Sequence, residues 1–320
     1  MANPRVNISA FSGTLFGSSQ GLAARFVAHR GANNESPGNT LPHFPENTLH
    51  SLREAYAKGA IYVECDVHKT KDNKIIVIHD ETLFRTARFN PDIAKTLTKE
   101  DFLNIRNKNV SELSFVNEVS QVDVGSYASY LSDKFKGTKV SLLEDFLLEL
   151  KNHSERKLII EVKMGDMSIV DELQKLIKHY AAQYEIKDEQ LLFISFDFDL
   201  LKSLKMFLSN YKHLFLTIAT PSDTNSSDDA YHLIKTKNDL DKMIQMVLKA
   251  NLDGLDVEYD SDLIDEDFMK RIRDHNLTSA VWTYPKDDRL AMAIQMLTAG
   301  ADLINTNQPE FIFENLHRPS

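Results

Sequence analysis

The chain has 320 residues, of which 42% are hydrophobic and 26% are charged, proportions that are typical of a soluble globular protein. Its 37 Lys and Arg against 47 Asp and Glu give a net charge of −10, which provides no overall field for binding nucleic acid or an anionic membrane. The single cysteine, Cys65, excludes an intrachain disulfide, and no apolar run reaches the roughly 18–20 residues of a membrane span. We therefore expect a cytoplasmic protein without a signal peptide or a transmembrane segment.

Short apolar runs alternate with stretches of helical periodicity along most of the chain. Alternating strands and helices are typical of parallel βαβ units, so the pattern predicts an α/β fold. The predicted strands are Phe26–His29, Ile61–Val67, Ile75–His79, Leu158–Val162, Leu191–Phe196, Leu214–Ala219, Gly254–Glu258, Ala280–Thr283 and Asp302–Asn305. The predicted helices include Leu142–Leu150, Val170–Tyr180, Leu200–Leu208, Leu240–Leu248 and Leu290–Leu297.

One connection is too short for a parallel crossover. Only Lys69–Lys74 separates the second and third runs, whereas a crossover needs about a dozen residues. The turn-forming residues of this segment predict a β-hairpin between the two runs. In its register, the residue numbers of paired positions add up to about 143. Without the returning strand, eight parallel strands remain, the number that closes a (β/α)8 TIM barrel.

The barrel domain is predicted over residues 25–320, after an N-terminal extension of residues 1–24. The long segment 80–139 follows the hairpin and contains one helical pattern, Lys99–Ile105. We expect it to be a small insertion packed on one end of the barrel, because long unpatterned loops inside compact domains are usually functional or mobile.

The second predicted strand carries the densest group of acidic residues. Because side chains alternate across a strand, Glu64 and Asp66 should face the barrel interior while Cys65 faces the outer helices. Two carboxylates in an interior repel each other and lose hydration, so they need a cation. Hard oxygen ligands suit Mg²⁺ or Ca²⁺, and the alternative is that the acids pair with Lys or Arg from facing strands.

A further carboxylate and a lysine share one face of the next parallel strand. Glu161 lies near the carboxyl end of that strand, which is the catalytic end of such barrels, and it is the natural third carboxylate. Lys163 lies one step further along and is a candidate phosphate contact. The alternative is a surface Glu161–Lys163 ion pair, worth at most about 1 kcal/mol.

Two histidines end predicted strands, His29 on the first and His79 on the hairpin. A single strand-end histidine is more often structural than catalytic, but two of them beside three acids favour a general acid–base pair. Arg30 follows His29 with a fixed charge and a fork suited to phosphate, and Gly31 then allows a sharp backbone turn.

Taken in order, these motifs closely resemble the glycerophosphodiester phosphodiesterase family, from about Arg25 to Pro309. The motifs that carry the resemblance are Val27-Ala28-His29-Arg30-Gly31, Pro45-Glu46-Asn47-Thr48, Val63-Glu64-Cys65-Asp66-Val67, Thr70-Lys71-Asp72, His79-Asp80-Glu81-Thr82-Leu83, Arg85-Thr86, Val122-Asp123-Val124-Gly125-Ser126, Ser141-Leu142-Leu143-Glu144-Asp145, Glu161-Val162-Lys163, Ser195-Phe196 and Val281-Trp282-Thr283.

The resemblance implies a (β/α)8 barrel with an insertion and metal-dependent hydrolysis of glycerophosphodiesters to glycerol 3-phosphate and an alcohol. Carried onto this chain, it implies that His29 and His79 form the acid–base pair and that Glu64, Asp66 and Glu161 hold a divalent cation. It further implies that Arg30 and Lys163 contact the phosphate and that Trp282 walls the substrate pocket. Glu46 and Asn47 would brace Arg30 and the metal site.

Two alternatives remain at this stage. The first keeps the site but changes the substrate to a lysophospholipid, as in lysophospholipase D or sphingomyelinase D-like enzymes, with an apolar channel supplied by residues 40–44 and the insertion. The second is a non-catalytic barrel that binds phosphodiesters or a protein partner, whose signature would be the loss of a histidine or a carboxylate. Both histidines, His29 and His79, and the three carboxylates are present. The sequence does not indicate the leaving alcohol, the choice between Mg²⁺ and Ca²⁺, the acid–base assignment or the oligomeric state.

Overall fold

The structure of the protein is a computed structural model, which describes residues 24–35, 42–219, 232–284, 288–309 and 311–312. The predicted N-terminal extension lies outside the described residues except for residue 24. Residues 40 and 41 of the loop proposed as part of an apolar channel also lie outside them.

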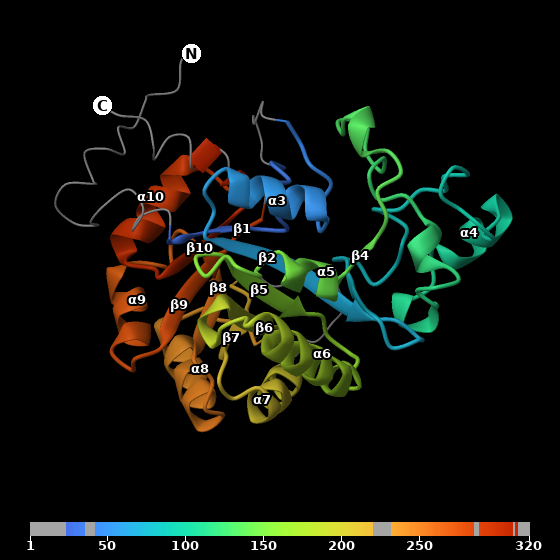
Figure 1. Cartoon of the computed structure of the whole chain (residues 1–320). Helices are drawn as coiled ribbons and strands as arrows, with labels where there is room; N and C mark the ends of the chain where they lie inside the picture. The colour runs from blue at the N-terminus through green and yellow to red at the C-terminus, as the bar shows by residue number, and fades with distance from the viewer. Residues whose placement is uncertain (1–23, 36–41, 220–231, 285–287, 310, 313–320) are drawn as a thin grey trace, which may run out of the picture.

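Eight parallel strands close into a barrel, as predicted (Figure 1). Their spatial order is β1-β10-β9-β8-β7-β6-β5-β2, and β1 pairs with β2 to complete the ring. The fold is therefore a (β/α)8 TIM barrel. The barrel strands are β1 (Phe26–Ala28), β2 (Tyr62–Lys69), β5 (Lys157–Val162), β6 (Leu191–Ser195), β7 (Lys212–Thr217), β8 (Gly254–Glu258), β9 (Thr278–Trp282) and β10 (Leu303–Thr306).

The predicted hairpin is present after the second strand. Strand β3 (Ile75–Val77) runs antiparallel to β2 and pairs Val67 with Val77 and Lys69 with Ile75, one position from the predicted register. A further strand, β4 (Ser141–Leu142), pairs with β3 and returns the chain from the insertion to the barrel. The sequence did not predict β4, because two residues are too few to show an alternating pattern.

Helices surround the barrel and cover its strands (Figure 1). The α-helices are α3 (Leu49–Ala57), α4 (Lys99–Ile105), α5 (Leu143–Leu148), α6 (Ile169–Tyr184), α7 (Phe198–Phe207), α8 (Lys237–Lys249), α9 (Glu266–Arg273) and α10 (Leu290–Ala299). The predicted elements include neither α3 nor α9. Both bury apolar side chains at helical spacing, Leu52, Ala55 and Tyr56 in α3 and Phe268, Met269 and Ile272 in α9, so the sequence did carry a periodic signal for them.

Three hydrophobic clusters divide the interior. The largest packs the outer faces of the strands against the helices, and it includes Val63, Cys65 and Val67. A small cluster fills the barrel lumen with side chains such as Val27 and Leu214. The third belongs to the insertion, which lies beyond the carboxyl end of β2 with α4 at its far side (Figure 1). The insertion therefore has a core of its own at the catalytic end of the barrel.

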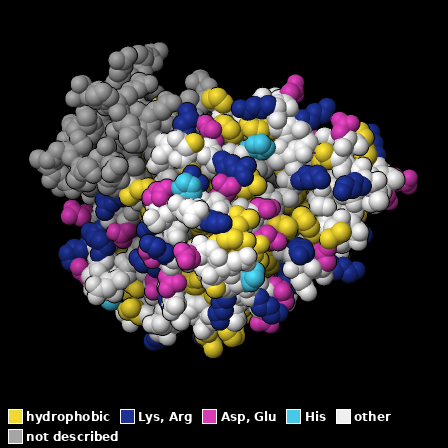
Figure 2. Space-filling view, in the orientation of Figure 1, with side chains coloured by type: hydrophobic (Ala, Val, Ile, Leu, Met, Phe, Trp, Pro, Cys, Tyr) yellow, Lys and Arg dark blue, Asp and Glu magenta, His cyan; other side chains and the backbone are white. Residues whose placement is uncertain are grey.

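The surface carries charges of both signs. Figure 2 shows Lys and Arg interspersed with Asp and Glu over the visible face. Among the described residues, no helix is long and apolar enough to cross a membrane.

Cys65 tests the register of β2 directly. Its side chain is fully buried in the cluster between strands and helices, on the opposite face from Glu64 and Asp66, as alternation predicts. We expect Cys65→Ala to lower the free energy of unfolding by about 1–2 kcal/mol, the usual range for a small core truncation, and to leave catalysis unchanged. Thermal or denaturant unfolding together with a rate assay checks this, and a loss of activity without a loss of stability would contradict it.

Candidate active site

Three buried carboxylates meet at the carboxyl ends of two neighbouring strands. The register of β2 and β5 places Asp66 directly beside Glu161, and Glu64 lies two residues earlier on the same face of β2. One oxygen of each lies within 4.8 Å of the others, and all three side chains are buried. Their charges repel in a low-dielectric interior, so this geometry requires a cation.

The surroundings of Glu64 indicate the kind of cation that the three acids suit. Glu64 Oε1 is buried and has no hydrogen-bond partner among the described residues. Burial, together with the charges of Asp66 and Glu161, raises the pKa of Glu64 well above its usual range. A buried carboxyl oxygen without a hydrogen-bond partner is available as a metal ligand, and all three acids offer hard oxygen donors. The donor set therefore fits a hard divalent cation such as Mg²⁺ or Ca²⁺.

A sharp turn after β1 and the loop that follows it hold two of these acids in place. Arg30 has a φ of 54° and donates its backbone N–H to Glu64 Oε2 at 2.8 Å. Gly31 follows with a φ of 83°, and a Cβ there would lie 2.5 Å from the Ser51 hydroxyl oxygen, so this turn needs glycine. The Asn47 amide donates to Asp66 Oδ2 at 2.7 Å and accepts from the Asp66 backbone N–H at 3.1 Å.

Two basic side chains reach the same carboxylates. The Lys163 ammonium lies 2.6 Å from Asp66 Oδ1 and also bonds Glu161. The Arg30 guanidinium lies 3.4 Å from Asp66 and 3.2 Å from Glu46. Despite the cost of burial, Lys163, His79 and Arg30 together hold the pKa of Asp66 well below its usual range. The alternative of charge pairing thus holds for Asp66 but not for Glu64 Oε1, and the Glu161–Lys163 pair is buried rather than at the surface.

The position of Lys163 predicts competition with a metal ion. Its ammonium bonds two of the three candidate ligands, so a divalent cation must displace it or bind against its charge. We expect Lys163→Met to bind Mg²⁺, Ca²⁺ or Mn²⁺ on the order of tenfold more tightly, measured by calorimetry, because it removes one like charge from a partly screened site. Lys157→Met is the matched control, since Lys157 begins the same strand at the other end of the barrel. Unchanged or weaker binding by Lys163→Met would contradict the prediction.

His29 directs one ring nitrogen toward the acids. Its Nδ1 bonds Asn307 Oδ1 at 2.7 Å, so Nδ1 carries the proton and Nε2 is left as an acceptor 3.9 Å from Glu64 Oε2. Burial, with a smaller effect of Arg30, lowers the pKa of His29 to about 3. The ring is therefore neutral at neutral pH and able to accept a proton.

His79 has a different partner. Its Nδ1 donates to Asp80 Oδ1 at 2.7 Å, and this bond fixes the orientation of the ring. His29 and His79 each contribute to the low pKa of Asp66, which places both rings within electrostatic reach of the same carboxylate. The structure thus places His29 beside Glu64 and His79 within electrostatic reach of Asp66.

The remaining predicted residues also lie at this end of the barrel. The side chain of Glu46 is only 2% exposed, and its carboxylate accepts hydrogen bonds from Arg30 and Arg85. Trp282 ends β9, donates its indole N–H to the Thr217 carbonyl at 3.0 Å, and packs edge-on against Phe196. All ten predicted site residues are described; Glu46 reaches the acids through Arg30, and Trp282 lies at the end of β9.

Four side chains of this end of the barrel and its interior were missed by the sequence-based prediction: Asp80, Arg85, Asn307 and Asp256. Asp80 and Arg85 belong to motifs that carry the family resemblance, so the sequence did give a signal for these two residues. Asn307 gave no signal, because its contact with His29 spans 278 positions and exists only once β10 pairs with β1. Asp256 is a fourth acid buried in the barrel, bonded by the Asn305 amide at 3.1 Å, and burial raises its pKa to about 8.

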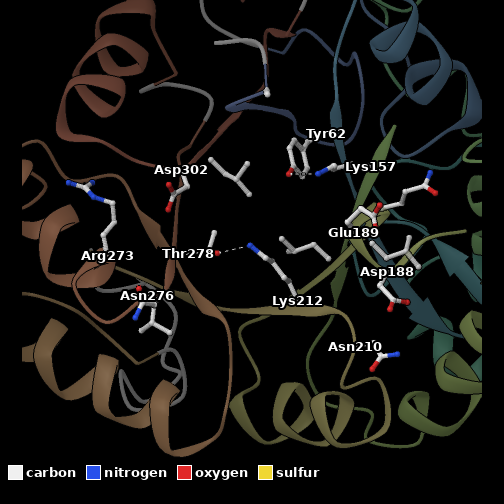
Figure 3. Close-up of a pocket in the computed structure, with 16 residues that line it drawn as sticks. Tyr62, Lys157, Asp188, Glu189, Asn210, Lys212, Arg273, Asn276, Thr278 and Asp302 are labelled. Atoms are coloured by element: carbon white, nitrogen blue, oxygen red, sulfur yellow. Dashed lines mark hydrogen bonds between the residues drawn. The ribbon is translucent and has the colours of Figure 1, made fainter. Parts of the chain in front are cut away.

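A cavity of about 690 Å³ lies at the opposite end of the barrel (Figure 3). It is lined by residues at the amino ends of the strands, with Lys157 beside Tyr62 and Lys212 bonded to Thr278. Of the described residues that line it, none is a histidine, and the carboxylates there are accompanied by basic side chains. The catalytic end of the barrel is therefore the candidate active site.

Comparison with known proteins relates the chain to a sequence family. A sequence model of the "Glycerophosphoryl diester phosphodiesterase family" matches residues 29–311. The chain is 28% identical over 189 residues to a glycerophosphodiester phosphodiesterase of Caldanaerobacter subterraneus, covering 58% of this chain and 63% of that protein. It is 28% identical over 211 residues to the human glycerophosphocholine phosphodiesterase GPCPD1, covering 60% of this chain and 30% of that protein.

Solved structures share the fold. A phosphodiesterase from Oleispira antarctica, solved in complex with the product sn-glycerol-3-phosphate, superimposes with a TM-score of 0.66 at 18% identity, over 94% of this chain and all of that one. The alignments cover less than two thirds of the length of both curated relatives.

Proposed function

The chain belongs to the glycerophosphoryl diester phosphodiesterase family, and we propose that it hydrolyses glycerophosphodiesters to glycerol 3-phosphate and an alcohol with the help of a divalent cation. The observation that carries this proposal is the grouping of His29 and His79 around three buried carboxylates, beside Arg30 and Lys163. Phosphodiester cleavage needs this combination of proton transfer and positive charge.

Glu64, Asp66 and Glu161 would hold the cation, whose bound charge would stabilise the negative charge that develops on the phosphoryl oxygens. Arg30 and Lys163 supply fixed positive charge at the same place, and both are largely buried. Their side chains orient a phosphodiester between the two histidines, since a guanidinium fork and an ammonium both bind phosphate oxygens.

The hydrogen bonds of the histidines support a division of labour. Because Asn307 holds the proton on Nδ1 of His29, Nε2 of this neutral ring accepts the proton of the attacking nucleophile, which is water in the step that releases glycerol 3-phosphate. Because Asp80 accepts the Nδ1 proton of His79 and fixes that ring, its Nε2 is the nitrogen left to donate a proton to the leaving alkoxide. His29 is thus proposed as the general base and His79 as the general acid.

The test is the release of glycerol 3-phosphate from glycerophosphocholine, glycerophosphoethanolamine and glycerophosphoglycerol, with chelator and after metal is restored. We expect release that depends on the metal. Release that is indifferent to chelator would contradict the metal proposal, and no turnover of any diester with Mg²⁺, Ca²⁺ or Mn²⁺ would favour the non-catalytic alternative.

Apolar side chains around the carboxyl ends of the strands favour testing the lysophospholipid alternative. Phe84, Met167 and Tyr284 follow β3, β5 and β9, and each is about half exposed. In the insertion Tyr130 is also exposed, whereas Leu113 and Tyr127 are buried and serve its packing. A higher kcat/KM for lysophosphatidylcholine than for glycerophosphocholine would establish this alternative.

A further inference from the structure

Arg85 lies in the insertion, outside the barrel, yet it bonds two carboxylates of the site. Its Nη1 and Nη2 donate to the two oxygens of Glu46, both at 2.7 Å. Its Nε and Nη2 donate to the two oxygens of Asp80 at 2.8 and 2.9 Å. Such paired contacts fix the orientation of both carboxylates, because a planar guanidinium matches each of them in one geometry.

Each of these carboxylates also bonds a side chain of the reaction centre. Asp80 accepts from His79 Nδ1 at 2.7 Å, and Glu46 accepts from Arg30 Nη1 at 3.2 Å. The contacts therefore form one continuous chain, which runs from His79 through Asp80, Arg85 and Glu46 to Arg30. Its two ends are the proposed proton donor and a proposed phosphate-binding side chain.

Without the guanidinium, both ends of this chain change. Glu46 is buried and would turn fully to Arg30, drawing that side chain away from phosphate, since a buried carboxylate needs a charged partner. Asp80 is partly exposed and would be free to rotate, so the ring of His79 would lose its fixed orientation. A misplaced catalytic group lowers the rate even when the fold is intact.

We propose that Arg85 is a positioning residue that orients His79 through Asp80 and Arg30 through Glu46. The insertion thereby takes part in the reaction, although it contributes none of the groups proposed to bind the metal. This inference rests on the proposed function and adds a residue to it.

The first test compares Arg85→Met with Arg53→Met in kinetics on two substrates. Arg53 is the matched control, because its Nε and Nη2 both donate to one carboxylate oxygen of Glu149, at an exposed position. For an alkyl diester we expect Arg85→Met to lower kcat by about 10–100-fold and to raise KM, while Arg53→Met changes neither. For a nitrophenyl ester, whose leaving group needs no proton, the loss in kcat should be several-fold smaller while KM still rises.

Two further variants separate positioning from a merely structural role. Arg85→Lys keeps the charge but not the fork, so it should restore KM more than kcat. In an Asp80→Asn background, Arg85→Met should add little to the loss in kcat, because both changes act on His79. Equal losses on both substrates together with a lowered Tm, or fully additive losses, would overturn the proposal.

A last readout does not depend on turnover. In protein labelled with ¹⁵N-histidine, the ring nitrogen signals of His79, assigned by their absence in His79→Ala, should shift in Arg85→Met and not in Arg53→Met. Unchanged signals would overturn the proposal for Arg85 whatever the substrate. A wild type that turns over no diester, but whose His79 signals respond to Arg85→Met, would overturn the proposed function and leave the positioning role intact.

Discussion

Replacing either His29 or His79 with alanine is expected to lower the rate of diester hydrolysis by about 10²–10⁴-fold, the usual span of general acid–base catalysis. Each ring has its Nδ1 held by a hydrogen bond, that of His29 by Asn307 and that of His79 by Asp80. His→Ala at either position removes a proton-transfer group and leaves the barrel core untouched, so circular dichroism and Tm should change little.

The two variants should differ in their dependence on the leaving group. A nitrophenolate departs without protonation, so loss of the acid matters little for such an ester. We expect His79→Ala to retain much more activity on a nitrophenyl ester than on an alkyl diester, and His29→Ala to lose activity on both alike. Equal losses by both variants on both substrates would contradict the assignment, and the reverse pattern would exchange the two roles.

The dependence of the rate on pH gives a second check of the same pair. An acid and a base acting together predict a bell-shaped profile. His29 must be unprotonated, and its pKa is lowered to about 3, so activity should fall on the acidic side only well below the usual range of histidine. The alkaline limb reports loss of the proton from the acid, so it should disappear in His79→Ala.

Neutralising a carboxylate of the acidic cluster should be the most damaging change to metal binding. We expect Asp66→Asn and Glu161→Gln each to weaken binding of Mg²⁺ or Ca²⁺ by at least about tenfold and to lower turnover sharply, because each removes one charged oxygen ligand of three. Metal-free wild type should remain folded, since a barrel of this size has a large core of its own. Calorimetric titration and thermal unfolding measure the two effects separately.

Asp256→Asn is the matched control for these variants. Asp256 is also buried in the barrel, but it bonds Asn305 and is not one of the three clustered acids. Its pKa of about 8 means that it is mostly protonated at neutral pH, so the amide replaces a neutral group of the same shape. The metal affinity of Asp256→Asn should match that of the wild type. An Asp66→Asn protein with unchanged affinity and turnover would exclude Asp66 as a ligand.

Local pattern in the sequence was sufficient for the barrel and for the direction of its side chains. Alternation along β2 placed Cys65 outward and the two acids inward, and the short segment before Ile75 required the hairpin. These features depend on neighbouring positions, which a single sequence displays. The same holds for the likeness to a known family, since its motifs are short and continuous.

Contacts between distant segments could not be predicted in this way. The bond of Arg85 to Glu46 requires the insertion to dock on the barrel end, and the bond of His29 to Asn307 requires closure of the ring. Neither contact leaves a periodic trace, because each depends on where a loop or strand end arrives in space. The partners of the two histidines therefore became visible only with the structure.

The closure of β1 against β10 has a consequence for the order in which the proposed active site is assembled. Synthesis on the ribosome delivers His29 among the first residues of the barrel and Asn307 among the last, 278 positions later. The ring that is proposed to remove the proton therefore remains untethered until the final strand has left the ribosome and docked. A nascent chain that already carries both histidines and all three acids should have no hydrolytic activity until that moment.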